Sequence, residues 1–278
     1  MGKGAGEELA GVRAGGGAAP VIGEMDGWAG RLAQGIAWAV RRSLEGAGGA
    51  ALSFSGGVDS ALIAHLAARS DVPVRLYTVG LPGAPDLGAS ERSAAALGLA
   101  GRHSVIVLRA EEALEAAGRV RALLPGATLL EVSFLAPSFL VFERAGERRA
   151  LTGDGADELF GGYHRYLSMA PAALATSLEK DARELLSGGF ERNRRLAAAA
   201  GKEVSAPYLD PEVAALARAI PPHLKVAAGE RKVVLRRAAA LLGLPPELCA
   251  LPKRAAQYGT GIHALLTKKK FKQAIKWT

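Results

Sequence analysis

Phe54-Ser55-Gly56-Gly57-Val58-Asp59-Ser60 is a loop of small residues between the apolar run 50–53 and the apolar segment 61–66. This order predicts a β-strand, a glycine loop and an α-helix. The two glycines let the backbone approach a bound anion, and the helix start offers that anion unpaired N–H groups and a positive dipole end. The loop lacks the lysine of a Walker A motif and carries Asp59 instead. We therefore predict a site that holds pyrophosphate through a metal ion, so that ATP is cut at its α-phosphate.

A second signature stands further along the chain, at Thr152-Gly153-Asp154-Gly155-Ala156-Asp157-Glu158-Leu159-Phe160-Gly161-Gly162-Tyr163. The first motif resembles the pyrophosphate loop (PP-loop) of N-type ATP pyrophosphatases, and the second resembles a signature of asparagine synthetases. The pair is more specific than either half, because the first motif also occurs in tRNA-modifying and in NAD- or GMP-forming ligases. The resemblance covers roughly residues 43–265. It implies an α/β fold of the adenine nucleotide alpha-hydrolase type.

Strand and helix patterns alternate around the two motifs. Further strands are expected at 74–79, 102–108 and 149–152, and helices at 89–97 and 111–124. This alternation predicts a doubly wound parallel sheet that binds its ligands outside the carboxyl ends of the strands. Residue 152 then brings the second signature to the same edge as the first.

Helical patterns flank this unit on both sides. An amphipathic helix that packs against the nucleotide-binding unit is expected where four apolar residues recur at helical spacing, namely Trp28, Leu32, Ile36 and Val40. From Pro171 onward only helices are expected, at 171–187, 190–200, 210–219 and 231–242. We predict that this helical C-terminal half caps the ligand edge of the sheet.

Composition is that of a folded protein: 278 residues, 49% hydrophobic and 22% charged, which is enough to bury a core. We expect a flexible leader rich in glycine and alanine at 1–24, the ATP pyrophosphatase domain at 25–265 and a basic tail at 266–278. The leader has no continuous apolar core of a signal peptide. The most apolar stretch, 129–142, is interrupted by Glu131 and Pro137 and is too short to cross a bilayer. These features favour a cytoplasmic protein without a membrane partner.

Charge and cysteine content narrow the class of partner. The single cysteine, Cys249, can form neither an internal disulfide nor a metal cluster, so the chain lacks the cysteine pairs of sulfur-transferring PP-loop proteins. The net charge of +8 fits a polyanion, either ATP or RNA. The lysines of the basic tail are interpreted as a solvated, partly helical end, and a nucleic-acid partner is not expected.

The predicted nucleotide site draws on both motifs. Asp59 and Asp157 come from separate loops and could meet on one Mg²⁺, a hard cation that prefers carboxylate and phosphate oxygens. The resemblance implies the same role, and helix capping is the alternative for Asp59. Backbone and hydroxyl donors for phosphate oxygens are expected from the loop, at Ser55, Gly56, Gly57 and Ser60. The resemblance also implies that adenosine is lined by Phe54, Val79, Thr152 and Gly153.

Three residues are candidates for catalysis. The segment 251–261 resembles the part of asparagine synthetases that carries a lysine before a Gly-x-Gly turn, so Lys253 is expected to stabilise charge on the α-phosphate, with a solvated lysine as the alternative. Asp154 stands where many of these enzymes have a glutamate that takes a proton from ammonia. Glu203 could orient an amine or simply form an ion pair, and Ser205 stands where the family has arginine.

These residues together predict an asparagine-synthetase-like amide ligase. ATP and Mg²⁺ would serve to adenylate aspartate or another small carboxylate, because AMP is a far better leaving group than hydroxide. The enzymes of this family begin with a glutaminase domain whose first cysteine attacks glutamine, whereas the chain has no cysteine before Cys249. Ammonia is therefore expected from solution or from a separate glutaminase subunit. The sequence does not decide whether the chain forms a homo-oligomer.

Two alternatives remain from the sequence. Asp154 and Ser205 leave open a β-lactam-synthetase-like or peptide-modifying ligase that closes an amide on another amine. A tRNA-modifying PP-loop protein would keep the nucleotide pocket and bind RNA in a salt-dependent way. The presence of Lys253 and the absence of cysteine pairs count against this second alternative.

Overall fold

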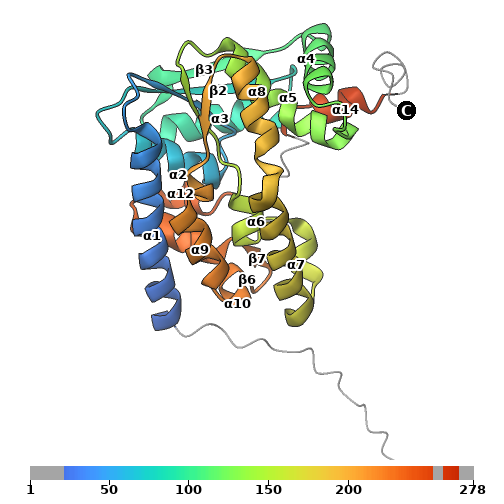
Figure 1. The fold of residues 1–278 in the computed structure, drawn as a ribbon. Coiled ribbons are helices and arrows are strands. Elements are labelled where there is room, and N and C mark those ends of the chain that lie inside the picture. Colours follow the sequence, from blue (N-terminus) through green and yellow to red (C-terminus); the bar gives the residue numbers. More distant parts are fainter. Residues whose placement is uncertain (1–21, 253–258, 269–278) are drawn as a thin grey trace, which may run out of the picture.

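A five-stranded parallel sheet forms the centre of the computed structural model, which describes residues 22–252 and 259–268 (Figure 1). Its strands are β1 (Ala50–Ser53), β2 (Val74–Gly80), β3 (His103–Val107), β4 (Arg149–Leu151) and β5 (Glu203–Ser205). They lie in the order β3-β2-β1-β4-β5, and every neighbouring pair is parallel. The predicted doubly wound α/β fold is therefore confirmed.

The strand order explains where a ligand can enter. The chain builds outward from β1 to β3 in one direction and then from β4 to β5 in the other. The strand order thus changes direction between β1 and β4, and an open α/β sheet leaves a crevice for ligands at the carboxyl ends of the strands at such a point. The two sequence motifs are the loops after these two strands.

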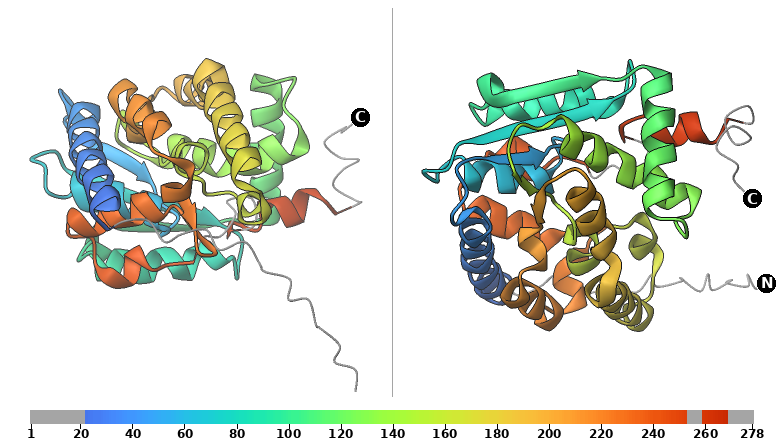
Figure 2. Two further views of the ribbon diagram at one scale, coloured as in Figure 1. Left: turned by 90° about the horizontal axis from the view of Figure 1, so that it is seen from below. Right: turned by 45° about the horizontal axis from the view of Figure 1, so that its top comes forward.

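Helices cover both faces of the sheet (Figure 2). Because side chains alternate along a strand, Leu52 and Leu76 belong to one hydrophobic core, while Ala51 and Tyr77 belong to the other. The first core also includes residues of α1 (Ile22–Leu44), α2 (Val58–Ala67), α3 (Pro85–Ala96), α9 (Pro211–Ala219) and α11 (Val233–Leu241). The second includes residues of α4 (Ala110–Leu123), α5 (Leu129–Arg144), α8 (Glu191–Ala199) and α14 (Ile262–Leu266).

Helix α1 follows from the apolar stripe in the sequence. Leu32, Ile36 and Val40 are buried, and Trp28 packs against the same core from its edge. The helix lies along α9 and α11. It begins at Ile22, so the last three residues of the predicted leader are helical, and residues 1–21 lie outside the described residues.

The apolar segment 129–142 forms most of α5, a helix with Pro137 in its interior. Glu131, the charged residue in this apolar run, forms a capping box with Thr128 at the start of the helix. Its backbone N–H donates to Thr128 Oγ1 at 3.2 Å, and its carboxylate accepts from the Thr128 backbone N–H at 2.8 Å. In the described part of the chain, no helix combines the length and apolarity that crossing a membrane requires.

The C-terminal half is helical except for short strands. Its remaining helices are α6 (Ala156–Phe160), α7 (Pro171–Glu184), α10 (Pro222–Lys225) and α12 (Pro246–Cys249), and a two-stranded hairpin pairs β6 (Val226–Ala227) with β7 (Glu230–Arg231). The prediction of helices alone after residue 171 is wrong for β5, which continues the main sheet beside β4. Three residues are too few for a periodic pattern, so their pairing with β4 makes them a strand.

Lys225, at the end of α10, is a buried lysine with 5% of its surface exposed. Burial lowers the pKa of its ammonium to about 8, and the Glu179 carboxylate acts in the opposite direction. The unfolded value is 10.5, so the unfolded chain binds more protons between pH 8 and pH 10.5. The cost of burying the charge is therefore complete below pH 8 and falls as pH rises through this interval.

Replacing Lys225 with methionine is expected to raise the free energy of unfolding at pH 7 by roughly 1–3 kcal/mol, because the buried charge is removed. The advantage over the wild type shrinks toward pH 10, where the folded wild type already holds a neutral amine. Urea unfolding of both proteins at pH 7 and pH 10 measures this difference. An advantage that is the same at both pH values contradicts the explanation by charge burial.

Candidate nucleotide site

A cavity of about 430 Å³ opens at the carboxyl edge of the sheet, within the size range of small-molecule sites. One part of its wall is polar and comes from the loop after β1 and the start of α2, with Ser55, Gly56, Gly57 and Asp59. Another part is apolar and comes from β2, α5, α12 and the segment after α12, with Val79, Phe134, Pro137, Val141, Leu248 and Leu251. The C-terminal half thus helps to cap the ligand edge, as predicted. The cavity suits a flat, weakly polar group that carries an anionic chain.

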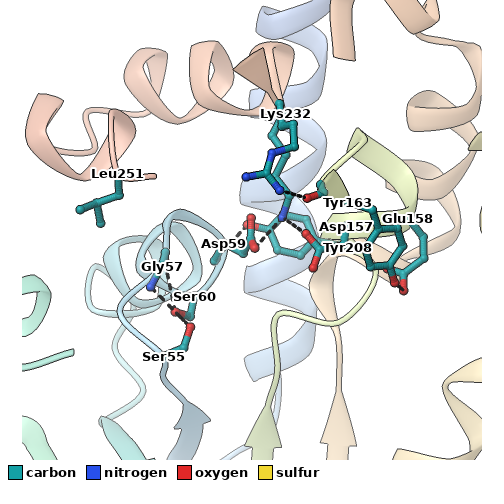
Figure 3. A network of polar contacts seen from close by, with 12 residues as sticks. Ser55, Gly57, Asp59, Ser60, Asp157, Glu158, Tyr163, Tyr208, Lys232 and Leu251 are labelled. Carbon is teal, nitrogen blue, oxygen red and sulfur yellow. Dashed lines mark hydrogen bonds and ion pairs between the residues drawn. The ribbon is translucent and has the colours of Figure 1, made fainter. Parts of the chain in front are cut away.

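The glycine loop gathers hydrogen-bond donors at the start of α2 (Figure 3). The Gly57 N–H donates to Ser55 Oγ at 3.4 Å, and the Ser55 and Ser60 hydroxyl oxygens lie 3.4 Å apart. Gly56 has a φ of +75°, a conformation that favours glycine. Two hydroxyls, one backbone N–H and a helix N-terminus thus converge, which is the arrangement that binds phosphate oxygens.

Asp59 and Asp157 meet, as the sequence predicts, and the cation between them is Lys232 (Figure 3). The Lys232 Nζ atom lies 2.6 Å from Asp59 Oδ2 and 2.6 Å from Asp157 Oδ1. The lysine side chain is completely buried, whereas the aspartate side chains are 14% and 21% exposed. Gly57 is the N-cap of α2 and no side chain caps that helix, so the capping alternative for Asp59 is wrong.

Tyr208 holds Asp59 from the other side. Its buried hydroxyl donates to the backbone carbonyl of Asp59 at 2.9 Å, and its ring packs edge-on against Phe160 of α6. Tyr208 lies in the short helical turn Pro207–Leu209 that follows β5. The late segment of the chain therefore fixes the position of the first motif.

The donor set fits a magnesium ion that arrives with a nucleotide. In residues 22–252 and 259–268, no cluster of three or more His, Cys, Asp or Glu side chains could hold a metal ion. Two carboxylates, one from the first turn of α2 and one from the first turn of α6, suit Mg²⁺ when phosphate oxygens and water supply its other ligands. Asp59 and Asp157 are the residues that would hold such an ion.

Asp154 lies near Asp157, and one of its carboxylate oxygens accepts two hydrogen bonds. Thr152 Oγ1 donates to Asp154 Oδ2 at 2.6 Å, and the Asn193 amide of α8 donates to the same oxygen at 2.7 Å. Burial raises the pKa of Asp154, the two hydrogen bonds oppose this effect, and the charge of Asp157 adds to it. The result is a carboxylate that is more basic than an ordinary aspartate.

Tyr163 and Glu158 form a half-buried polar pair. The tyrosine hydroxyl donates to Glu158 Oε1 at 2.5 Å. Burial is the main cause that raises the pKa of both groups, and for Tyr163 the neighbouring Glu158 charge adds to it. Tyr163 therefore keeps its proton and serves structure.

Asp154 and Asp157 do not line the cavity, and the other predicted site residues, apart from Glu203, fall into three groups. Those that line the cavity are Phe54, Ser55, Gly56, Gly57, Asp59 and Val79. Three more do not line it, namely Ser60, Thr152 and Gly153: Ser60 contacts Ser55, Thr152 contacts Asp154, and a Cβ on Gly153 would lie 3.6 Å from the Asp59 Cβ. Lys253 lies outside the described residues, although its neighbour Pro252 lines the cavity.

Glu203 requires a correction. It is the first residue of β5 and is paired with Arg149, the first residue of β4, so it lies at the amino edge of the sheet, opposite the cavity. Its carboxylate forms ion pairs with Arg148 at 2.7 Å and Arg149 at 3.2 Å, and its side chain is 51% exposed. The ion-pair alternative is correct, and the predicted role in orienting an amine is wrong.

Sequence reasoning missed Lys232 and the cavity residue Arg92 of α3. A signal for Lys232 existed, because it directly precedes α11 and a cation at the N-terminus of a helix is unfavourable. Its backbone also has a φ of +59°, which is uncommon for a residue other than glycine. Such a position calls for a compensating anion, and the structure supplies two.

The fold and the glycine loop define a nucleotide-binding α/β protein of the adenine nucleotide alpha-hydrolase type. A comparison with protein families then matches residues 31–175 and 167–278 to the family described as asparagine synthase. The chain belongs to this family.

Two relatives illustrate the match. A protein of Methanocaldococcus jannaschii named as a glutamine-hydrolyzing asparagine synthetase is 33% identical over 253 residues, which covers 77% of this chain and 46% of the relative. The glutamine-hydrolyzing asparagine synthetase 1 of Saccharomyces cerevisiae is 29% identical over 241 residues, with 72% and 42% coverage. The chain thus spans less than half the length of these relatives. Among solved structures, an NMN synthetase from Francisella tularensis aligns with 91% of each chain at a TM-score of 0.43 and 14% identity.

Proposed function

We propose that the chain is the synthetase unit of an ATP-dependent amide ligase that activates a carboxylate, with aspartate as the first candidate. The observation that carries this proposal is the convergence of Asp59 and Asp157 on the buried Lys232, beside a glycine loop that offers phosphate donors. In a member of the asparagine synthase family, such a cluster supports a site that neutralises pyrophosphate.

The first step forms an acyl adenylate. A carboxylate oxygen attacks the α-phosphorus of ATP, the bond from this phosphorus to the bridging oxygen breaks, and pyrophosphate leaves. The Gly57 N–H and the Ser55 hydroxyl bind the departing phosphates, the Ser60 hydroxyl supports this loop by donating to the Gly57 carbonyl at 3.2 Å, and the Lys232 ammonium keeps the two aspartates in place. Bound Mg²⁺, held by Asp59 and Asp157, would neutralise charge on the phosphates.

The second step transfers nitrogen. Ammonia attacks the acyl carbon, the bond from this carbon to the AMP oxygen breaks, and one proton leaves the nitrogen. Asp154 is suited to take that proton because burial raises the pKa of its carboxyl group. Among the described residues, the hydrogen bonds from Thr152 and Asn193 both end on Oδ2, so Oδ1 is the atom that receives the proton. Ammonia reaches this site from solution or from a glutaminase unit.

A second candidate keeps the adenylate and changes the amine: a β-lactam-synthetase-like or peptide-modifying ligase. The observation that favours it is Ser205, whose carbonyl accepts from the Thr152 backbone N–H at 3.0 Å at the start of the second motif. A serine here removes the guanidinium that the family resemblance leads one to expect beside the substrate.

The test is an assay of the purified chain with ATP, Mg²⁺, aspartate and ammonium. We expect AMP, pyrophosphate and asparagine in equal amounts, and their loss by at least about a hundredfold in Lys253→Ala, the scale of losing one charged transition-state contact. Arg254→Ala is the matched control, because it removes a neighbouring positive charge and is expected to keep most of the activity. ATP binding without AMP formation contradicts aspartate as the substrate. AMP formation with another amine, and without ammonium consumption, favours the second candidate.

A further inference from the structure

We propose that Ser93 of α3 is a positioning residue that locks the Gly56–Gly57 peptide in its anion-binding orientation. The Ser93 hydroxyl donates to the backbone carbonyl of Gly56 at 2.7 Å, and the serine is 2% exposed. Ser93 does not belong to either sequence motif, and it reaches the glycine loop from the helix that follows β2. The inference rests on the proposed function, because it concerns how that loop binds phosphate.

Peptide geometry explains why this bond matters. In a planar trans peptide the C=O and the following N–H point in opposite directions, and the described chain contains no cis peptide bond. With the Gly56 carbonyl turned toward Ser93, the Gly57 N–H faces Ser55 Oγ inside the loop. The reverse orientation would bring a carbonyl oxygen into the loop, where it would repel a phosphate.

The loop needs such a lock because it contains two adjacent glycines. A peptide between two glycines can rotate at low cost, since neither residue has a Cβ that restricts its backbone angles. The hydrogen bond within the loop does not prevent this rotation, because the distance from Gly57 N to Ser55 Oγ is 3.4 Å, which is long for a hydrogen bond. The buried 2.7 Å bond from Ser93 is the shorter and better shielded of the two.

Ser90 provides a matched control on the same helix. It is completely buried, and its backbone lies against Gly56, but its hydroxyl donates to Leu87 O within α3 at 2.8 Å. The substitutions Ser90→Ala and Ser93→Ala therefore remove the same group from the same helix at similar burial. Only the second removes a bond to the loop.

The experiment measures binding of inorganic pyrophosphate with Mg²⁺, and separately of adenosine, by titration calorimetry to the whole chain. We expect Ser93→Ala to weaken pyrophosphate binding roughly three- to tenfold, the value of one buried hydrogen bond, and to leave adenosine binding within about twofold. Ser90→Ala is expected to change neither affinity. Ser93→Thr keeps the hydroxyl and is expected to restore most of the pyrophosphate affinity.

Three results would overturn the inference. Equal pyrophosphate affinity in the wild type and Ser93→Ala shows that the bond does not position the loop. A parallel loss of adenosine binding, or the same loss in Ser90→Ala, shows that the serine only supports the fold. A wild type that binds adenosine but no pyrophosphate removes the proposed function and this inference with it, and that result is distinguishable from the first two because it needs no variant.

Discussion

Replacing Lys232 with methionine is expected to lower the free energy of unfolding by about 3–5 kcal/mol, because it leaves two aspartates close together without their counter-charge. The lysine side chain is completely buried, and its ammonium lies 2.6 Å from a carboxylate oxygen of both Asp59 and Asp157. Methionine fills most of the volume of lysine, so the loss is electrostatic. The same change is expected to abolish pyrophosphate binding, since the loop after β1 and the loop after β4 lose the group that joins them.

The control is Lys225→Met, which removes another buried lysine from the same half of the chain. In the described part of the structure Lys225 forms no ion pair within 4 Å, and its substitution is expected to stabilise. Urea unfolding at pH 7 then gives effects of opposite sign for two chemically identical substitutions. A loss below about 1 kcal/mol for Lys232→Met, the size of an exposed ion pair, would contradict the buried bridge.

Replacing Gly56 with alanine is expected to cost about 2–5 kcal/mol, from a left-handed backbone and from steric overlap. Gly56 has a φ of +75°, and a Cβ there would lie 2.7 Å from both the backbone N and the Cα of Ser90. Backbone atoms cannot turn aside as a side chain can, so α3 itself would have to move. That movement would also break the bond from Ser93 to the loop.

The neighbouring glycine is the control. Gly57 has a φ of −74°, which alanine adopts freely, and the nearest atom to a Cβ there is Ser55 Oγ at 3.5 Å. Gly57→Ala is therefore expected to stay within about 1 kcal/mol of the wild type, the range for this change at a helix N-cap. Thermal and urea unfolding of the two variants side by side measure the contrast. Equal losses would show that the loop, and not its contact with α3, sets the cost.

The sequence was sufficient to predict four of the five strands of the sheet and the meeting of its two motifs. Alternating strand and helix patterns fix the doubly wound fold, and parallel strands bring the loops after β1 and β4 to one edge, so Asp59 and Asp157 were expected to lie together. The order of elements carries this information without any side-chain detail. What it does not carry is the contact of Lys232 with the two aspartates, because that contact depends on how α11 packs against α1 and α6.

The prediction for Glu203 shows a different limit. Similarity to a family pattern located the residue in a segment near the site, but the strand register places residue 203 at the start of β5 and Ser205 at its end. Glu203 and Ser205 thus lie at opposite ends of this short strand. The pairing of β5 with β4 decides which end of β5 faces the ligand. A strand of three residues is too short for this pairing to be predicted from the sequence.

The bridge at Lys232 also bears on the order in which the chain can mature. Its ammonium joins residues 59 and 157, and it stands 173 positions after the first of them. A chain still growing on the ribosome holds both aspartates before it holds the lysine, so in that interval the two negative loops repel each other. The bridge can therefore form only after residue 232 has been made. Pyrophosphate binding then reports that the C-terminal half has been made and has docked.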